Sequence, residues 1–215
     1  MKRTIPAEQI VMASIDLSLR SPAMVIFDSH NIRIFCFAQR QKDHNIIKKS
    51  IFGEWYYSFT VFPAINSKNS NCERYAHITS FLLSELITIS KTRALHVRIE
   101  DYAYSNQSNA MFKLMELCGI LKQQLFVHEI PFEVVNISRW KKNFTGRGNA
   151  TKQHVYRHAV DKHKIIDLCD VFHHLKCDKN GQPPSPINDI YDSIGIAGIF
   201  SSSTTPPKKK IKNSK

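Results

Sequence analysis

The chain has 215 residues, of which 42% are hydrophobic and 10% aromatic, with only 7 glycines and 9 prolines. This length predicts a single domain with a sizeable core, and the composition excludes a mainly disordered, collagen-like or repeat protein. No stretch approaches the ~18 consecutive apolar residues of a membrane helix, and the first residues make a poor secretory signal. We therefore predict an intracellular protein with no membrane partner.

The charge of the chain is strongly positive. It carries 30 Lys and Arg against 18 Asp and Glu, a net charge of +12. Five of the lysines lie in the C-terminal run PPKKKIKNSK (206–215), and without them the net charge would still be +7. Such an excess favours a polyanionic partner, nucleic acid above all, over a merely solubilising surface.

The first third of the chain predicts β-structure. Short apolar runs separated by polar turns are typical of an antiparallel three-stranded meander. After an N-terminal extension (1–9), the expected elements are strands at 10–17, 23–28 and 32–37, a polar loop at 39–54, and a possible short strand at 55–62.

From residue 71 onward, helices and strands alternate. Apolar residues at spacings of three and four predict the helices, and β-capable runs predict the strands. The expected elements are helices at 71–91, 110–126, 151–162 and 188–200, strands at 94–100 and 131–137, and a basic, glycine-containing loop at 139–152. This order predicts an α/β domain over 10–200, a mixed sheet with helices on its faces, followed by a disordered Lys-rich tail (201–215).

Four acidic residues stand where such a fold can bring them together. Asp16 ends the first strand and Glu100 ends the strand after the first helix, while Asp189 and Asp192 share one face of the last helix. Taken singly, each acid could be a helix cap or a solvated strand end. Taken together, they would repel one another, and divalent Mg²⁺ or Mn²⁺ would relieve that repulsion.

A second candidate metal site lies in the segment CDVFHHLKC (169–177). Its Cys169, His173, His174 and Cys177 are the residue types of a zinc site. Their spacing matches none of the common zinc patterns, so a helix end with partly buried thiols and solvent-facing imidazoles is the favoured alternative. The five cysteines are otherwise typical of a reducing compartment.

Five segments, in chain order, resemble those of the RuvC-type Holliday junction resolvases, members of the ribonuclease H-like (retroviral integrase) superfamily. The flavour is closest to viral, especially bacteriophage, versions. The matching segments are SIDLS (14–18), VRIEDYAY (97–104), KLMELCGILK (113–122), KKNFTGRGNATK (141–152) and NDIYDSIGIA (188–197). The opening SIDLS departs from the usual Gly-Ile-Asp-Pro-Gly of the family but keeps its acid.

The resemblance implies a fold, an activity and a set of site residues. The fold would be a ribonuclease H-like mixed five-stranded sheet. Its activity would be endonucleolytic resolution of branched DNA through two Mg²⁺ ions (Mn²⁺ substituting), leaving 5′-phosphates, with no small-molecule cofactor. The implied catalytic residues are Asp16, Glu100, Asp189 and Asp192 as metal ligands, with Lys152 on the phosphate. The implied DNA-binding residues are Lys141, Lys142, Arg147 and Lys152, with Tyr102 or Tyr104 as a wedge.

Several points stay open at the level of the sequence. The same acids would serve a ribonuclease H-like nuclease acting on RNA–DNA hybrids or flaps, and the scaffold could also belong to a non-catalytic DNA-binding protein. The family implies a homodimer, for which the helix at 110–126 is the candidate interface, although it could equally be buried within one chain. The basic tail resembles a nuclear import signal, which would matter only in a eukaryotic host.

Overall fold

The structure is a computed structural model of the chain. It describes residues 10–28, 31–37, 51–52, 56–62, 70–102, 108–172 and 175–200. The predicted N-terminal extension and Lys-rich tail lie outside the described residues, so both stay predictions. No helix within the described ranges has the length and apolar character needed to cross a membrane.

The centre of the fold is one mixed sheet in the order β4-β5-β3-β2-β1-β6-β7. Its strands are β1 (Val11–Asp16), β2 (Ala23–Asp28), β3 (Asn31–Phe37), β4 (Ile51–Phe52), β5 (Tyr56–Phe62), β6 (Leu95–Glu100) and β7 (Phe132–Val135). The predicted antiparallel meander β1–β2–β3 is confirmed, and β6 and β7 continue the sheet in parallel. The sheet has seven strands rather than five, because β5 pairs parallel to β3 and β4 pairs with β5.

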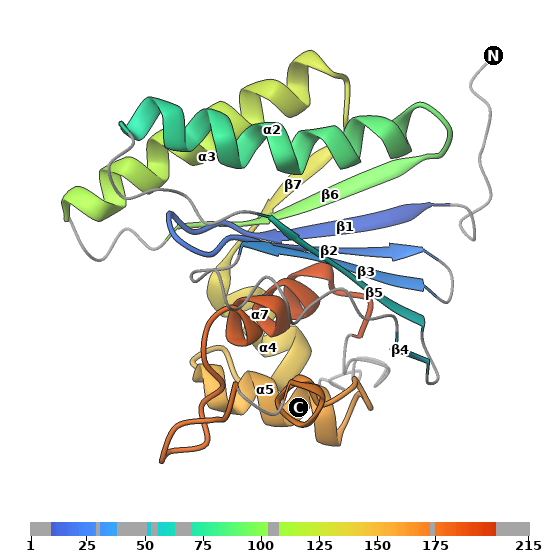
Figure 1. The fold of residues 1–215 in the computed structure, drawn as a ribbon, viewed down its shortest axis with the longest axis vertical. Coiled ribbons are helices and arrows are strands. Elements are labelled where there is room, and N and C mark those ends of the chain that lie inside the picture. The colour runs from blue at the N-terminus through green and yellow to red at the C-terminus, as the bar shows by residue number, and fades with distance from the viewer. Residues whose placement is uncertain are drawn as a thin grey trace, which may run out of the picture.

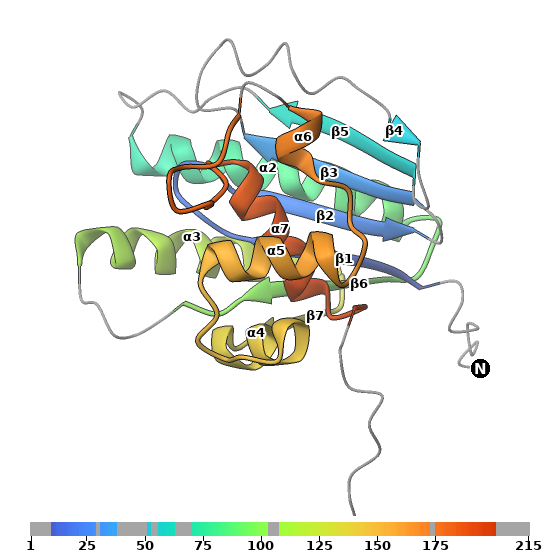
Figure 2. The same ribbon diagram turned by 90° about the horizontal axis from the view of Figure 1, so that it is seen from below.

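Six helices cover the two faces of this sheet. They are α2 (Asn71–Ser90), α3 (Asn109–Val127), α4 (Ile137–Thr145), α5 (Lys152–Asp161), α6 (Leu168–Val171) and α7 (Ile187–Ala197). Figure 1 shows α2 and α3 on one face and α4, α5 and α7 on the other, and Figure 2 shows the second layer from below. The predicted α/β class, with helices on both faces, is therefore confirmed.

The helix α2 follows the sequence prediction closely. Ser70 and Glu73 form a reciprocal capping box that satisfies free backbone amides at its start. Its buried face repeats at intervals of three and four residues and packs against the sheet together with α3. The buried residues of α2 are Tyr75, Ile78, Thr79, Leu82, Leu83, Leu86 and Ile89.

The prediction of a loop over 139–152 is wrong, because residues up to Thr145 form the helix α4. The Asn136 side chain caps its start, and Gly146, at φ 80°, ends it in the left-handed conformation that glycine tolerates best. Trp140 and Phe144 lie four residues apart and are both buried, which gives the basic segment an apolar face. Only the turn between Gly146 and Thr151 remains outside helices.

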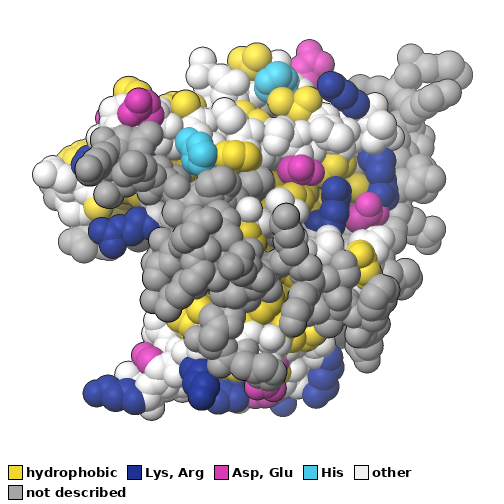
Figure 3. All heavy atoms as spheres, in the orientation of Figure 1, with side chains coloured by type: hydrophobic (Ala, Val, Ile, Leu, Met, Phe, Trp, Pro, Cys, Tyr) yellow, Lys and Arg dark blue, Asp and Glu magenta, His cyan; other side chains and the backbone are white. Residues whose placement is uncertain are grey.

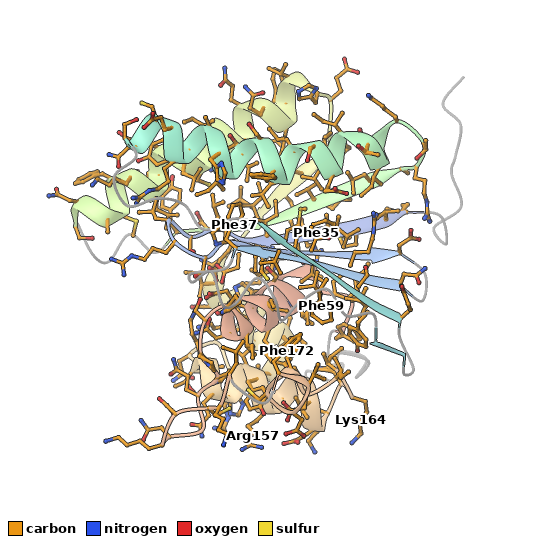
Figure 4. The ribbon with its side chains drawn as sticks, in the orientation of Figure 1. Phe35, Phe37, Phe59, Arg157, Lys164 and Phe172 are labelled. Carbon is orange, nitrogen blue, oxygen red and sulfur yellow. The ribbon has the colours of Figure 1, made fainter. Side chains whose placement is uncertain are left out.

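The layer of α4 to α7 has a core of its own. Every residue of α7 is buried, and Gly195 lets the helix approach Trp140, since a Cβ at that position would lie 2.6 Å from the indole ring. Phe59 of β5 meets Phe172 after α6 edge to face at 5.4 Å on this side of the sheet, whereas Phe35 and Phe37 point toward α2 (Figure 4). The sheet thus separates two apolar clusters.

Candidate nuclease site

Two of the predicted acids end neighbouring parallel strands. In the register of β1 and β6, Ile15 lies opposite Ile99, so Asp16 and Glu100 follow at the same edge of the sheet. Both strands read as apolar runs up to that point because they form the buried centre of the sheet. The carboxyl groups therefore lie where the central strands stop.

The helix α7 brings the other two acids to the same edge. Asp189 and Asp192 lie one turn apart near its start. Ser193 fixes the helix on the sheet, because its Oγ accepts a hydrogen bond from the Asp16 backbone N–H at 2.9 Å and donates one to the Ala23 carbonyl at 2.8 Å. These two contacts bridge α7 to β1 and β2 just where the first acid stands.

The four carboxyl groups are buried close enough to affect one another. Asp16, Asp189 and Asp192 are only 7%, 5% and 6% exposed. Burial, followed by the charges of Glu100, Asp192 and Asp189, raises the pKa of Asp16 well above its ordinary value. Burial, only partly offset by Lys152 and reinforced by Glu100, raises the pKa of Asp192 to about 7. The structure thus brings together the four acids that the sequence singled out.

Lys152 lies within this group, at the first residue of α5. Its Nζ donates a hydrogen bond to Asp189 Oδ1 at 2.8 Å and lies 3.5 Å from Asp192 Oδ2. Burial would lower the pKa of Lys152, but the two aspartates outweigh it and raise the pKa. Lys152 is therefore a firmly charged ammonium in the acidic cluster.

The two aspartates of α7 differ in how they are held. Asp189 Oδ2 accepts a hydrogen bond from Ser21 Oγ at 2.9 Å and lies 2.5 Å from Ser185 Oγ, while its other oxygen is bonded to Lys152. Asp192 Oδ1, by contrast, is buried with no hydrogen-bond partner among the described residues. One carboxylate is fixed by the protein, and the other carries an oxygen still able to accept a ligand.

Glu100 is held by a residue that the sequence analysis did not single out. Trp140 of α4 donates its indole N–H to Glu100 Oε1 at 2.9 Å. Burial raises the pKa of Glu100, and the Trp140 hydrogen bond and the nearby Lys141 only partly offset that effect. The signal in the sequence is weak: a tryptophan inside a basic segment, forty residues away from the acid.

The donor set of this cluster fits a hard divalent cation. Carboxylate oxygens are the ligands that Mg²⁺ and Mn²⁺ prefer, and a cation would relieve both the raised carboxyl pKa values and the unpartnered Asp192 oxygen. Among the described residues, however, no three His, Cys, Asp or Glu side chains are arranged around a point that could hold a metal. The bonds of Lys152 to Asp189 and of Trp140 to Glu100 account for that spread.

The other predicted DNA-binding residues lie around α4 and in the turn after it. Lys142 and Arg147 are exposed, and the half-buried Lys141 lies over the Trp140 ring at 5.6 Å. Tyr102 is half-buried against the core beneath α3, with Lys122 Nζ 5.5 Å from its ring. Tyr104 lies outside the described residues. In Figure 3, Lys and Arg side chains gather along the lower border of the molecule, in the layer of α4, α5 and α7.

Two further predictions are only partly within the described structure. Cys169 and Cys177 approach each other to 3.2 Å between sulfur atoms, and burial together with Cys177 raises the pKa of the Cys169 thiol to about 12. His173 and His174 lie outside the described residues, so the zinc site stays a prediction. The helix α3 buries one side against the sheet and exposes Phe112, Phe126 and Val127 on the other, which leaves its proposed interface role open.

The architecture defines the class of fold as ribonuclease H-like. Within it, the chain is similar to a structure described as Thermus thermophilus RuvC, with a TM-score of 0.52, 16% identity, and coverage of 87% of this chain and 91% of that one. It is equally similar to T. thermophilus RuvC in complex with Holliday junction substrate, with a TM-score of 0.52, 15% identity, and coverage of 88% and 90%. No protein-family model and no curated protein matches the sequence.

Proposed function

We propose that the protein is a Mg²⁺-dependent endonuclease that cuts branched DNA, including four-way junctions, during recombination, repair or viral genome processing. The observation that carries this proposal is the cluster of Asp16, Glu100, Asp189 and Asp192 at the end of the central strands of a RuvC-like fold. The solved complex of one similar protein with a Holliday junction supports branched DNA as the substrate class. The net charge of +12 supports a polyanionic partner.

In this proposal the four acids hold the metal. Bound Mg²⁺ would supply activation of the attacking water and stabilisation of charge on the phosphate and leaving oxygen. Asp192 offers its unpartnered oxygen, and Asp16 the oxygens of a carboxyl that is costly to ionise alone. Ser21 and Ser185 keep Asp189 in place, and Trp140 orients Glu100 toward the other acids.

Lys152 has a separate role in the same proposal. In the free protein its ammonium compensates the charges of Asp189 and Asp192. When a cation takes over that compensation, the ammonium is released to contact the phosphate being cut, beside the first amides of α5. Lys141, Lys142 and Arg147 would contact neighbouring phosphates, which positions the DNA without reading its sequence.

Symmetrical cutting of a four-way junction calls for two copies of the site. We therefore propose a homodimer, since a four-way junction has two-fold symmetry and one chain offers one acidic cluster. The exposed apolar residues of α3 are the proposed interface, with Phe126 78% exposed. The measurement is the molar mass in solution of the protein alone and bound to a junction.

The deciding experiment compares cleavage of a four-way junction, a flap, a linear duplex and an RNA–DNA hybrid in Mg²⁺. We expect paired nicks in the junction, with 5′-phosphate ends that a ligase can seal, and no cleavage by Asp16→Asn. Preferred cleavage of the hybrid or flap would instead favour a ribonuclease H-like role. Tight binding of the junction with no cleavage in Mg²⁺ or Mn²⁺ would identify a non-catalytic DNA-binding protein.

A further inference from the structure

A cleft of about 640 Å³ opens directly beside the acidic cluster. It lies between the turn that follows β1, the first turns of α3 and the start of α7. Two residues of the candidate nuclease site, Lys152 and Asp189, form part of its wall. Its volume lies in the range of small-molecule sites, which run from about 300 to 1,000 Å³. A group bound in this cleft would therefore be next to whatever the acids act on.

The two sides of the cleft differ in chemistry. Leu19, Met111 and Leu114 present half-buried apolar side chains on one side. On the other side stand polar groups of α7 and the segment before it, and Arg20 is exposed at the turn. An apolar wall facing polar groups suits a flat, partly polar ring such as a nucleobase, whose face is apolar and whose edge forms hydrogen bonds.

Asn188 supplies an independent sign of a ligand. It lines the cleft, is only 9% exposed, and its Oδ1 is buried with no hydrogen-bond partner among the described residues. Buried carboxamides are normally satisfied, so an acceptor left alone beside a cleft indicates a missing donor. An Asn carboxamide pairs well with a base edge that carries an amino group next to a ring nitrogen, as in adenine or cytosine.

From these observations we infer that the cleft binds one unpaired nucleotide next to the phosphate that is cut. Leu19 and Met111 pack on the face of its base, Asn188 bonds the edge of the base, and Arg20 contacts a phosphate on the far side from Lys152. A base in a duplex cannot enter such a cleft, whereas branched DNA offers unpaired bases at its crossover. This inference rests on the proposed nuclease function and adds a preference of the site for adenine or cytosine over thymine at one position.

The first test measures binding in EDTA, so that no cleavage is needed. Four-way junctions carry a single abasic nucleotide at each position flanking the crossover, and their affinities are compared with that of the intact junction. We expect one abasic position to weaken binding by the wild type about tenfold, the scale of one base–side-chain contact. Leu19→Ala should bind the intact and abasic junctions alike, as should Asn188→Ala if that variant folds.

The second test measures cleavage of junctions with a randomised base at the sensitive position. The wild type should prefer adenine or cytosine about tenfold, and Asn188→Ala should lose that preference. Asn180→Ala, a matched change at an exposed asparagine outside the cleft, should keep it. Thermal unfolding of each variant separates a missing hydrogen bond to the base from a damaged fold.

The failures of the two proposals are distinguishable. Normal junction binding and cleavage, with no abasic position that matters and no base preference, would overturn the nucleotide cleft while leaving the nuclease intact. Absence of any binding or cleavage of branched DNA by the folded wild type would overturn the proposed function itself, and the cleft with it.

Discussion

The two helical layers of the protein are built on opposite principles. On one face of the sheet, α2 buries a regular apolar stripe that joins the core beneath it. On the other face, α7 is buried on every side and carries Asn188, Asp189, Asp192 and Ser193 into the interior. The first layer stabilises the fold, whereas the second places polar groups where burial costs free energy unless each has a partner.

This difference locates the chemistry within the molecule. Ser193 and Asp189 have two or more hydrogen-bond partners each, but an oxygen of Asp192 and one of Asn188 have none among the described residues. A protein keeps such groups only where a ligand completes them, so the unsatisfied atoms of α7 mark its working surface. The predictions below test whether the two layers differ as described.

The largest effect is expected from removing a charge in the α7 layer. Asp192→Asn should lower cleavage by about 10⁴-fold or more, as loss of a catalytic group does in other enzymes. Single-turnover cleavage of a junction in Mg²⁺ measures it. The matched control is Asp161→Asn, an exposed acid at the end of α5, which should cut at the wild-type rate. Retained cleavage by Asp192→Asn would remove that residue from the site.

In the α2 layer the largest expected effect is on stability rather than activity. Leu82→Ala leaves a cavity in the apolar cluster and should lower the free energy of unfolding by about 2–5 kcal/mol. Urea unfolding measures this loss, with Ser80→Ala on the exposed side of the same helix as a control. At a temperature where Leu82→Ala is still folded, its cleavage rate should match that of the wild type. A selective loss of cleavage would show that the layers are coupled.

The pH dependence of stability should also set the layers apart. Because the pKa of Asp192 is about 7 in the folded chain against 3.8 for the ordinary side chain, the folded state binds the extra proton. Stability from this group is therefore full below pH 4 and is lost as the pH rises to 7. In EDTA, Asp192→Asn should equal the wild type near pH 4 and exceed it by a few kcal/mol at pH 8. Mg²⁺ should narrow that gap, and a gap independent of pH would contradict the assignment.

A smaller effect is expected from the residue that orients Glu100. Trp140→Phe keeps an aromatic ring in the core but removes the indole donor to Glu100. The Mg²⁺ concentration for half-maximal cleavage should rise about 10–100-fold, the range seen when second-layer partners of metal ligands are removed. Cleavage at saturating Mg²⁺ should recover most of the wild-type rate. A loss that Mg²⁺ does not restore would assign Trp140 to packing alone.

The smallest effect is expected from the Lys-rich tail, which belongs to neither layer and lies outside the described residues. Truncation after Thr205 should weaken binding to DNA of every shape alike. The log–log dependence of affinity on salt should flatten by ~0.9 for each phosphate that the tail no longer neutralises. Cleavage at saturating DNA should survive, and a truncated chain with an unchanged salt slope would exclude the tail as a DNA-binding segment.

The sequence predicts the α2 layer better than the α7 layer, and the reason is physical. Periodic apolar residues reveal α2 and the strands because each has one face in water or against one neighbour. In α7 burial on all sides erases that contrast, and only the spacing of Asp189 and Asp192 marks the helix as special. The helix α4 is missed because its basic residues conceal the face made by Trp140 and Phe144.

The partners of the acids are also beyond the reach of local patterns. Ser193 meets the Asp16 backbone across 177 positions, and Trp140 meets Glu100 across 40. A serine or a tryptophan has no feature in the sequence that predicts such a distant contact. The acids themselves are visible because they interrupt apolar runs, whereas the residues that hold them resemble ordinary core and surface positions.

The close approach of Gly195 to Trp140 has a consequence for how related sequences can diverge. A Cβ at position 195 would lie 2.6 Å from the indole, which is too short for any real contact. A larger residue can therefore arise at 195 only in a lineage where position 140 has already become smaller. That change would also remove the donor to Glu100. Among homologues, positions 100, 140 and 195 should vary as a group, and an alignment rich enough to measure covariation would reveal them as linked.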